Sequence, residues 1–442
     1  IAIPRVPSNP SGNFARRKTA SNPSAMNSSV ANSSVTNTTA TASVVPTSVF
    51  GSFRYAFSTL SRLRMEVFGG IAVSLALIPE TIAFSVLAGV DPAVGLYTSV
   101  IMALAIAFTG GRPAMITAAA GAVALVSAPL VKAHGVEYLI AAALLAGVIQ
   151  IVLSALGVAK LMRFITMPVM RGFVNALGIL IFTAQLEHVV DKPWMVFVLL
   201  AIGIALMFVV PRFLRAIPAP LIVVIVVTIT ALATGWRVPT VGEMGELPHS
   251  LPHINVPSVP LSWQSFGIIA PYAVAMAIVG LVESLLTAQL VDEITETPSS
   301  KTHEACGLGL ANIAGGIFGG MGGCAMIGQT MIGVQDSGAR TRLSTLVAGL
   351  TLLVLLLLFN DAVGAIPMIA LVAVMMVVAV RTVNWRSVNP LHIKRAPWPE
   401  TVVMLVTVIP TLATHNLAVG VVLGSVVAAM LNRGRGYAQQ EQ

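Results

Sequence analysis

The chain has 442 residues, of which 56% are hydrophobic and only 10% are charged, and its formal net charge is +8. Soluble domains carry about 25% charged residues, so this composition excludes a water-soluble globular protein and indicates a membrane protein. The positive charge does not indicate nucleic-acid binding. The basic residues stand in short gaps between apolar segments, and aromatic residues that could stack on bases make up only 6% of the chain.

The first 50 residues differ in composition from the rest of the chain. They are rich in Ser, Thr, Asn and Ala, and the first acidic residue is Glu66. Such a segment cannot bury enough apolar surface to fold, so we expect a disordered basic tail over residues 1–60. An organellar transit peptide is the alternative interpretation, because such peptides are also rich in Arg and Ser and poor in acids.

Fourteen apolar segments follow this tail, and several of them are short or interrupted by Gly and Pro. A membrane-spanning helix needs roughly 20 apolar residues. The predicted spans are 66–84, 93–109, 116–131, 137–157, 168–186, 194–210, 217–234, 267–290, 304–318, 325–334, 342–359, 365–380, 400–413 and 416–431. We therefore predict an all-α polytopic membrane protein with about 14 transmembrane segments, in contact with the lipid bilayer.

The distribution of basic residues predicts the orientation of these segments. If the N-terminus is cytosolic, the cytosolic gaps and the end of the chain hold Lys160, Arg163, Arg212, Arg215, Arg381, Arg386, Lys394, Arg395, Arg433 and Arg435. The opposite gaps hold only Lys132, Lys192 and Arg237. This asymmetry predicts that both termini are cytosolic, in a plasma or cytoplasmic membrane. The composition of the tail leaves an organellar membrane as the alternative.

The longest gap, residues 235–266, is Pro-rich and is predicted to lie on the non-cytosolic side. It separates residues 61–234 from residues 267–432, and each part contains seven predicted spans, with a short cytosolic tail over residues 433–442. Two parts with an odd number of crossings run in opposite directions through the membrane. The expected architecture is therefore a seven-plus-seven inverted repeat.

Each part contains a Gly-Gly pair followed, after a short spacer, by Ala-Met-Ile, at residues 110–116 and 322–327. Such a break ends a helix before it has crossed the bilayer, so the next half-helix begins near the midplane with unpaired N–H groups and a positive dipole end. Two such ends facing each other can bind an anion without an arginine. The alternative is ordinary close packing of small residues between helices. The predicted substrate-binding residues are Ala119, Ala120, Gly121, Ala325, Met326, Ile327, Gly328 and Gln329.

Two acidic residues lie inside predicted spans, where an ionised group costs roughly 2.5–3.5 kcal/mol. Glu80 follows Pro79 in the first span of the first part, and Glu283 lies in the first span of the second part. Thr287 is four residues beyond Glu283 and thus on the same helix face. A buried carboxyl can hold a proton, or hold Na⁺ together with a hydroxyl and backbone carbonyls. We predict that Glu80, Glu283 and Thr287 couple transport to an ion, with a protonated structural acid as the alternative.

The remaining polar residues suggest structural roles. Asn175, Gln185 and Asn312 are predicted to bridge helices, and Arg340 and Arg342 to flank the start of a span, with Arg340 alternatively facing the substrate path. Cys306 and Cys324 form no disulfide framework, and the histidines lack metal-ligand spacing. No nucleophile–base pair is visible. We therefore expect no cofactor, no resident metal and no enzymatic activity, with H⁺ or Na⁺ as the coupling ion.

At several of these places the chain resembles the SulP family of anion transporters, also called solute carrier family 26. The resemblance covers about residues 60–432 and rests on residues 78–84 (IPETIAF), 88–97 (AGVDPAVGLY) and 110–113 (GGRP), together with 280–287 (GLVESLLT) and 319–330. The Ala-Gly-x-x-Pro-x-x-Gly-Leu-Tyr pattern is quite specific to this family. Most members continue into a cytosolic STAS domain, so the resemblance is to the membrane domain.

The resemblance implies the seven-plus-seven fold shared with uracil permeases, with a core domain that holds the anion between the third and tenth spans, and a gate domain. It also implies elevator-like alternating access and a homodimer. Substrate residues of the family match Ala119, Ala120 and Gly121 and residues 325–329, and its acids match Glu80 and Glu283. Ala120 stands where some bicarbonate-carrying relatives have a hydroxyl, and Glu283 stands where they have an aspartate.

These departures leave the anion open among sulfate, bicarbonate and dicarboxylates. A nucleobase permease of the same fold is one alternative function. It would need polar side chains on both the eighth and the tenth spans, and the tenth has no acid to partner Glu283. An anion channel or motor-like protein is the other alternative. It would be favoured by a basic residue at the start of the tenth span, which this sequence lacks.

Overall fold

The computed structural model describes residues 46–157, 166–213, 218–245, 250–255, 257–260, 262–388, 397–414 and 417–433. The predictions for residues 1–45 and 434–442 lie outside this part of the chain, as do those for Lys160, Arg163, Arg215, Lys394, Arg395 and Arg435. One prediction at its edge is wrong. Residues 49–56, assigned above to the disordered tail, form helix α1 (Val49–Ala56), which packs Ser52 and Ala56 inward.

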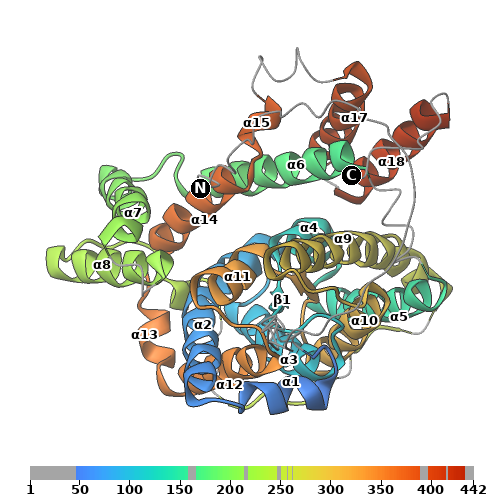
Figure 1. Cartoon of the computed structure of the whole chain (residues 1–442). Helices are drawn as coiled ribbons and strands as arrows, with labels where there is room; N and C mark the ends of the chain where they lie inside the picture. The colour runs from blue at the N-terminus through green and yellow to red at the C-terminus, as the bar shows by residue number, and fades with distance from the viewer. Residues whose placement is uncertain are drawn as a thin grey trace, which may run out of the picture. The chain divides into compact units, whose positions relative to one another are not determined.

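Helices account for nearly all of the regular structure in the described residues, and they reproduce the predicted spans (Figure 1). The first half contains α2 (Leu60–Ala88), α3 (Pro92–Thr109), β1 (Thr117–Ala119), α4 (Gly121–His134), α5 (Val136–Ala155), α6 (Met167–Gln185), η2 (Leu186–His188), α7 (Trp194–Phe213) and α8 (Ala219–Thr234). The linker contains η3 (Val241–Glu243).

The second half repeats this order of elements. It contains α9 (Trp263–Thr295), α10 (Lys301–Ile317), β2 (Gly323–Ala325), α11 (Ile327–Met331), the π-helical turn η4 (Ile332–Asp336), α12 (Arg342–Leu358), α13 (Asn360–Gly364), α14 (Met368–Thr382), α15 (Trp385–Val388), α17 (Trp398–Thr414) and α18 (Leu417–Arg433). By length and composition, six described helices could cross a membrane, namely α2, α3, α5, α6 extended by η2, α7 and α9. The other apolar helices, α4 among them, are shorter.

Local signals explain where the helices begin and end. Thr59 caps α2 by accepting a hydrogen bond from Arg62 N at 3.3 Å, and Ser262 caps α9 by accepting one from Ser265 N at 3.1 Å. Gly89 ends α2 in the left-handed conformation, with φ of 77°, and Pro92 opens α3. These residues set the boundaries to within a few residues of those expected from hydrophobicity.

The two halves exchange packing partners in a reciprocal pattern. α5 of the first half lies against α9 and α10 of the second, and α12 of the second half lies against α2 and α3 of the first. The pairs α7–α14 and α6–α17 repeat this exchange, as do α4–α9 and α11–α2. A repeat related by a two-fold axis produces this pattern, as the sequence predicts.

The helices form two groups in Figure 1. We call α1 to α5 with α9 to α12 the core group, and α6 to α8 with α14, α17 and α18 the gate group. The linker between the halves forms hydrogen bonds to both groups of helices. Val241 N donates to Ile366 O at 2.8 Å beside α14, whereas Asn255 N donates to Ile317 O at 2.8 Å at the end of α10. The grouping corresponds to the core and gate domains that the family resemblance implies.

Candidate functional site

The break in the first half begins where α3 ends at Thr109. Gly111 passes so close to α10 that an added Cβ would lie 2.2 Å from Ser300 O, so only glycine fits there. The buried carboxylate of Glu304 accepts hydrogen bonds from Gly111 N at 2.7 Å and from Arg112 N at 2.9 Å. Glu304 therefore holds the backbone in a turn after α3, and the chain continues into β1 instead of extending the helix.

The break in the second half is shaped by glycines and by Asn312. Gly319 and Gly322 have positive φ angles of 75° and 77°, which side-chain-bearing residues rarely adopt. Asn312 of α10 accepts a hydrogen bond from Gly323 N at 2.8 Å and donates one to Gly323 O at 3.1 Å. Its amide also donates to Gln150 Oε1 of α5 at 2.9 Å. Asn312 bridges helices as predicted, and it also holds the start of β2.

The two breaks pair with each other, although they lie about 200 residues apart in the sequence. β1 and β2 are antiparallel, with Thr117 opposite Ala325, Ala118 opposite Cys324 and Ala119 opposite Gly323. Met326 N extends the ladder by donating to Ile116 O at 2.8 Å. The strands were not predicted. They occur because each broken segment must pair its backbone groups inside the protein, and the other break supplies the partner.

The half-helices are α4, which follows β1, and α11, which follows β2. They begin at opposite ends of this ladder, and both contact the same face of α2. Their N-caps, Ala120 and Met326, are about 13 Å apart along the strands at 3.3 Å per residue. Gly121 lies against the Phe84 ring, where an added Cβ would be 2.6 Å away, and the Gln329 side chain interacts with the Glu80 carboxyl. Glu80 and Phe84 are one helical turn apart, about 6 Å along α2. Both half-helix ends therefore reach one small region.

The backbone N–H groups of the predicted substrate residues fall into two sets. Three of them have protein acceptors: Ala119 N donates to Ser99 Oγ at 3.2 Å, Ala325 N to Ser284 Oγ at 2.9 Å, and Met326 N to Ile116 O. These three hold the ladder together. In contrast, the N–H groups of Gly121, Ile327 and Gly328 donate to no acceptor within the described residues, as first-turn groups of helices commonly do.

Gln329 and Gly328 differ from the small, packed residues around them. Gln329 is 1% exposed, and its amide Nε2 lies beside the Glu80 carboxyl but forms no well-aligned hydrogen bond within the described part of the chain. A buried unpaired donor is costly, so such groups mark places where a ligand or water completes the pairing. Gly328 is exposed, and a Cβ added to it would meet nothing within 4 Å. The region therefore has open space beside a buried donor.

The two acids flank this region from α2 and α9. Glu80 is 7% exposed and follows Pro79, whose missing N–H leaves the carbonyl of Leu75 without a helical partner. Glu283 is 8% exposed and accepts a hydrogen bond from Cys324 Sγ at 3.0 Å. Thr287 Oγ1 donates to the backbone oxygen of Glu283 at 2.8 Å. Thr287 thus shares the face of Glu283, as expected, but its proton is directed to the main chain.

Several hydroxyl and thiol groups at the site were not predicted. Ser99 and Ser284 accept from the ladder, Thr330 Oγ1 accepts from Ile116 N at 3.0 Å, and Cys324 donates to Glu283. In the sequence they are single small polar residues in apolar spans, a pattern also produced by ordinary helix packing. Only the 280–287 motif could have indicated Ser284, because it stands directly beside Glu283.

A charged cluster lies at the start of the first break. Arg112 forms an ion pair with Asp292 at 3.0 Å, and Lys301 forms a second one with the other oxygen of Asp292 at 2.7 Å. Burial lowers the pKa of the Arg112 guanidinium, and the charge of Asp292 opposes that shift. Arg342 donates to the carbonyls of Ala107 and Gly110. This cluster fixes the ends of α3 and α9 rather than lining the region between the half-helices.

Two further predictions concern polar residues outside this region. Arg340 Nη1 donates to Val334 O and to Ala339 O at 2.8 Å, so its guanidinium holds the turn after η4. Asn175 of α6 bridges elements as predicted: it donates to Ser387 Oγ at 2.8 Å and accepts from Asn384 N at 2.7 Å. Both contacts tie the gate group together near α15.

Comparison with known proteins places the chain in one family. The model of the sulfate permease family matches residues 63–196 and 188–407. The putative sulfate transporter YbaR of Bacillus subtilis is 48% identical over 379 residues, which cover 86% of this chain and 79% of that protein. The bicarbonate transporter BicA of a Picosynechococcus strain is 26% identical over 393 residues, covering 81% of this chain and 68% of that protein.

Solved structures share the fold. The transmembrane domain of a cyanobacterial bicarbonate transporter BicA superposes with a TM-score of 0.74 at 23% identity, covering 82% of this chain and 98% of that one. Murine Slc26a9, in the inward-facing state, superposes with a TM-score of 0.74 at 18% identity, covering 89% and 72%. These matches confirm the predicted fold. The chain belongs to the sulfate permease family and is a polytopic α-helical membrane protein.

Proposed function

We propose that this chain is a secondary active transporter of small inorganic or carboxylate anions, such as sulfate, bicarbonate or dicarboxylates. One observation carries the proposal. The N–H groups of Gly121, Ile327 and Gly328 have no acceptor within the described residues, and the half-helices that carry them reach the Glu80–Phe84 face of α2 through Gly121 and Gln329. Helix N-termini carry a partial positive charge and bind anions through backbone donors. The similarity to YbaR, a putative sulfate transporter, and to BicA, a bicarbonate transporter, supports a small anion as the substrate.

The nearby acids supply the coupling to an ion gradient. Glu80 and Glu283 are both more than nine-tenths buried, so each carries a charge only at a cost unless a cation accompanies it. A proton on either carboxyl removes that charge. Alternatively, Na⁺ balances the charge of the carboxylate, and its ligands would be Glu283, the hydroxyl oxygen of Thr287 and backbone carbonyls. In both cases the bound cation offsets the charge of the anion, so that the two cross together.

The division into two groups of helices supports an alternating-access mechanism. The breaks, both acids and Gln329 all belong to the core group, so the whole site moves with that group against the gate group, as in an elevator. The active form is a homodimer in a plasma or cytoplasmic membrane, with both termini in the cytosol. The gate group provides the fixed frame in this scheme.

Uptake into proteoliposomes tests the proposal. The purified chain is reconstituted, and uptake of radiolabelled sulfate, bicarbonate and fumarate is measured with and without a pH or Na⁺ gradient. We expect saturable uptake of at least one anion, faster under one of the gradients. Liposomes without protein are the control for leakage. Absence of uptake for every anion, by a protein that elutes as a single species in detergent, contradicts the proposal.

A further inference from the structure

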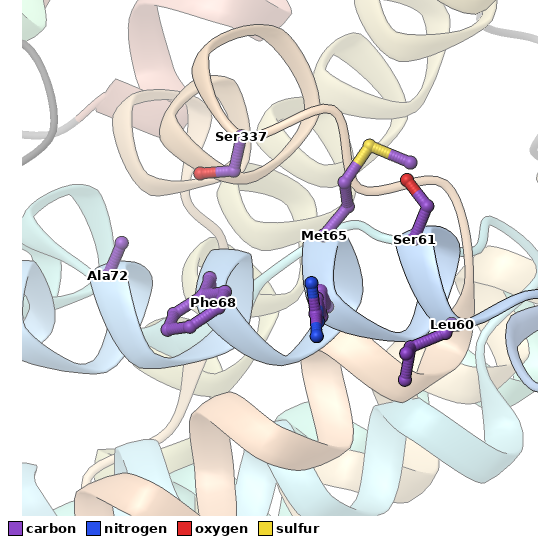
Figure 2. Close-up of a pocket in the computed structure, with 7 residues that line it drawn as sticks. Leu60, Ser61, Met65, Phe68, Ala72 and Ser337 are labelled. Atoms are coloured by element: carbon purple, nitrogen blue, oxygen red, sulfur yellow. The ribbon is translucent and has the colours of Figure 1, made fainter.

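A pocket of about 430 Å³ lies along the first turns of α2, away from the candidate anion site (Figure 2). Ser337, which follows η4, lies across from the α2 residues. The α2 residues that line the pocket recur at helical spacing and therefore share one face. They are Leu60, Ser61, Arg64, Met65, Phe68 and Ala72.

The apolar residues of the pocket wall are largely exposed. Phe68 is 67% exposed, Leu60 is 64% exposed and Met65 is 39% exposed. Exposed aromatic residues also occur on helix α1 and at its end, where Phe50 is 80% exposed and Phe57 is 62% exposed. Exposed large apolar side chains gathered in this way mark contact with a membrane or with another apolar partner.

The charged residues near the pocket on α1 and the start of α2 are all positive. Between residues 46 and 65 the chain holds Arg54, Arg62 and Arg64 and no acidic residue. The guanidinium of Arg62 stacks over the Tyr55 ring at 3.7 Å. Arg64 is exposed, and its guanidinium makes no hydrogen bond or ion pair within the described residues. It is therefore available to an anionic ligand.

The nearest acids leave this positive charge largely uncompensated. Glu66 is 1% exposed, and its carboxylate accepts hydrogen bonds from Arg340 N at 2.9 Å and from Thr341 N at 3.1 Å, so it is turned inward. Asp336 is exposed beside Ser337 on the opposite wall. Because its negative charge repels a phosphate, we expect a ligand phosphate to bind on the Arg64 side of the pocket.

The position of the pocket matches the headgroup layer of a bilayer. α2 is long and apolar enough to span a membrane, so its first turns lie at the interface. A basic side chain there reaches the lipid phosphates while its aliphatic stem lies along apolar surface. α1, with exposed aromatic residues and Arg54, has the composition of a helix lying in that interface. It is held in place by Ser52, whose Oγ accepts from Arg342 N at 3.0 Å.

We propose that this pocket binds one anionic phospholipid. Its phosphate pairs with Arg64 and Ser61, and one acyl chain runs along Met65 and Phe68 towards Ala72. The proposal is independent of which anion the protein carries, because the pocket shares no residue with the region between the half-helices. The three arginines and the lipid-facing aromatics favour a lipid over a soluble ligand, because a free phosphate would leave the apolar wall in contact with water.

Native mass spectrometry of the full chain in detergent tests the proposal. Binding of phosphatidylglycerol is compared with that of phosphatidylcholine of the same acyl chains, for wild type and for Arg64→Gln. Each basic residue near an anionic lipid surface contributes about 1 kcal/mol. We therefore expect phosphatidylglycerol to bind more tightly than phosphatidylcholine, and Arg64→Gln to weaken its binding about five-fold. The matched control is Arg212→Gln, which removes an exposed arginine from the last turn of α7 and should leave binding unchanged.

Two further arms separate a lipid site from its alternatives. Ala72→Phe fills the apolar end of the pocket without changing charge and is expected to reduce binding of phosphatidylglycerol. Inorganic phosphate is expected not to displace the lipid. Equal binding of the two lipids, equal loss with Arg64→Gln and Arg212→Gln, or displacement by inorganic phosphate would each overturn the proposal. Elution as a single species in detergent shows that each variant is folded.

Discussion

Cys324 Sγ donates a hydrogen bond to Glu283 Oε2 at 3.0 Å, and both side chains are buried. This bond joins the middle of strand β2 to the acid on α9. The adjacent Ala325 N donates to Ser284 Oγ on the same helix at 2.9 Å. The acid and the second break are therefore directly linked, and the proposed transport mechanism predicts that protonation or ion binding at Glu283 is transmitted through β2 to α11.

Cys324→Ala should impair transport, because it removes a donor to a buried acid. Hydrogen bonds to charged groups contribute about 1.5–3 kcal/mol, so the kcat/KM for anion uptake is expected to fall about ten-fold or more. Cys324→Ser keeps a donor and should retain most of the activity. The control is Cys306→Ser, at the other, partly exposed cysteine. Equal activity of the alanine and serine variants would show that the thiol only fills space.

Glu283→Gln should abolish gradient coupling or transport, because an amide neither takes up a proton nor balances the charge of Na⁺. Uptake is measured in proteoliposomes with and without the gradient that stimulates the wild type. Glu293→Gln on the same helix is the matched control, since Glu293 is exposed and its carboxylate bonds, within the described residues, only to Gln289, at 3.2 Å. Wild-type kinetics for Glu283→Gln would remove this residue from the mechanism.

Two glycines at the half-helix ends should respond oppositely to enlargement. At Gly328 an added Cβ meets nothing within 4 Å, so Gly328→Leu should block anion uptake and leave the melting temperature unchanged. At Gly121 an added Cβ would lie 2.6 Å from the Phe84 ring, so Gly121→Ala should destabilise the fold by about 1–3 kcal/mol.

Thermal unfolding in detergent and binding of the transported anion measure the two effects. Phe84→Leu combined with Gly121→Ala should recover part of the stability, because the smaller side chain relieves the contact. Unchanged anion binding by Gly328→Leu would move the substrate site elsewhere.

Gln329→Leu should weaken the affinity for the anion without destabilising the protein. The Nε2 group of Gln329 forms no well-aligned hydrogen bond in the described residues, so its removal costs only a weak interaction with the Glu80 carboxyl. A donor to a charged ligand contributes about 1.5–3 kcal/mol, which predicts a KM about ten-fold higher or more. Gln335→Leu, on the exposed side of η4, is the control. A lower melting temperature with an unchanged KM would assign Gln329 a structural role instead.

Glu304→Ala should destabilise the protein, because Glu304 Oε2 accepts from both Gly111 N and Arg112 N in a fully buried position. Leaving a buried N–H unpaired costs about 1–3 kcal/mol, so the melting temperature in detergent should fall by several degrees. Glu304→Gln keeps an acceptor oxygen and should be milder. Glu400→Ala, which removes a surface ion pair with Arg171 at 3.3 Å, should change little. Equal melting temperatures for Glu304→Ala and Glu400→Ala would refute this role.

The sequence by itself determined the class of the protein and the positions of its irregularities. The apolar spans, the breaks at Gly110 and Gly322, and the acids Glu80 and Glu283 inside spans could all be predicted. Length, hydrophobicity and the conformational freedom of glycine are local properties, so they can be read from neighbouring residues. Helix α1 was missed because its few apolar residues adjoin a long Ser- and Thr-rich segment and become stable only when packed on α12.

Tertiary structure decided which groups at those irregularities are free to bind a ligand. From the sequence alone, the backbone N–H groups of Ala119, Ala325 and Gly328 were all predicted to be available to an anion. In the fold, however, Ser99 and Ser284 take up the first two N–H groups, and the third stays unpaired. Glu304, which looked like the start of an ordinary span, accepts from a turn about 190 residues away. Such pairings depend on which distant segments become neighbours, and that is set by the packing of the two halves against each other.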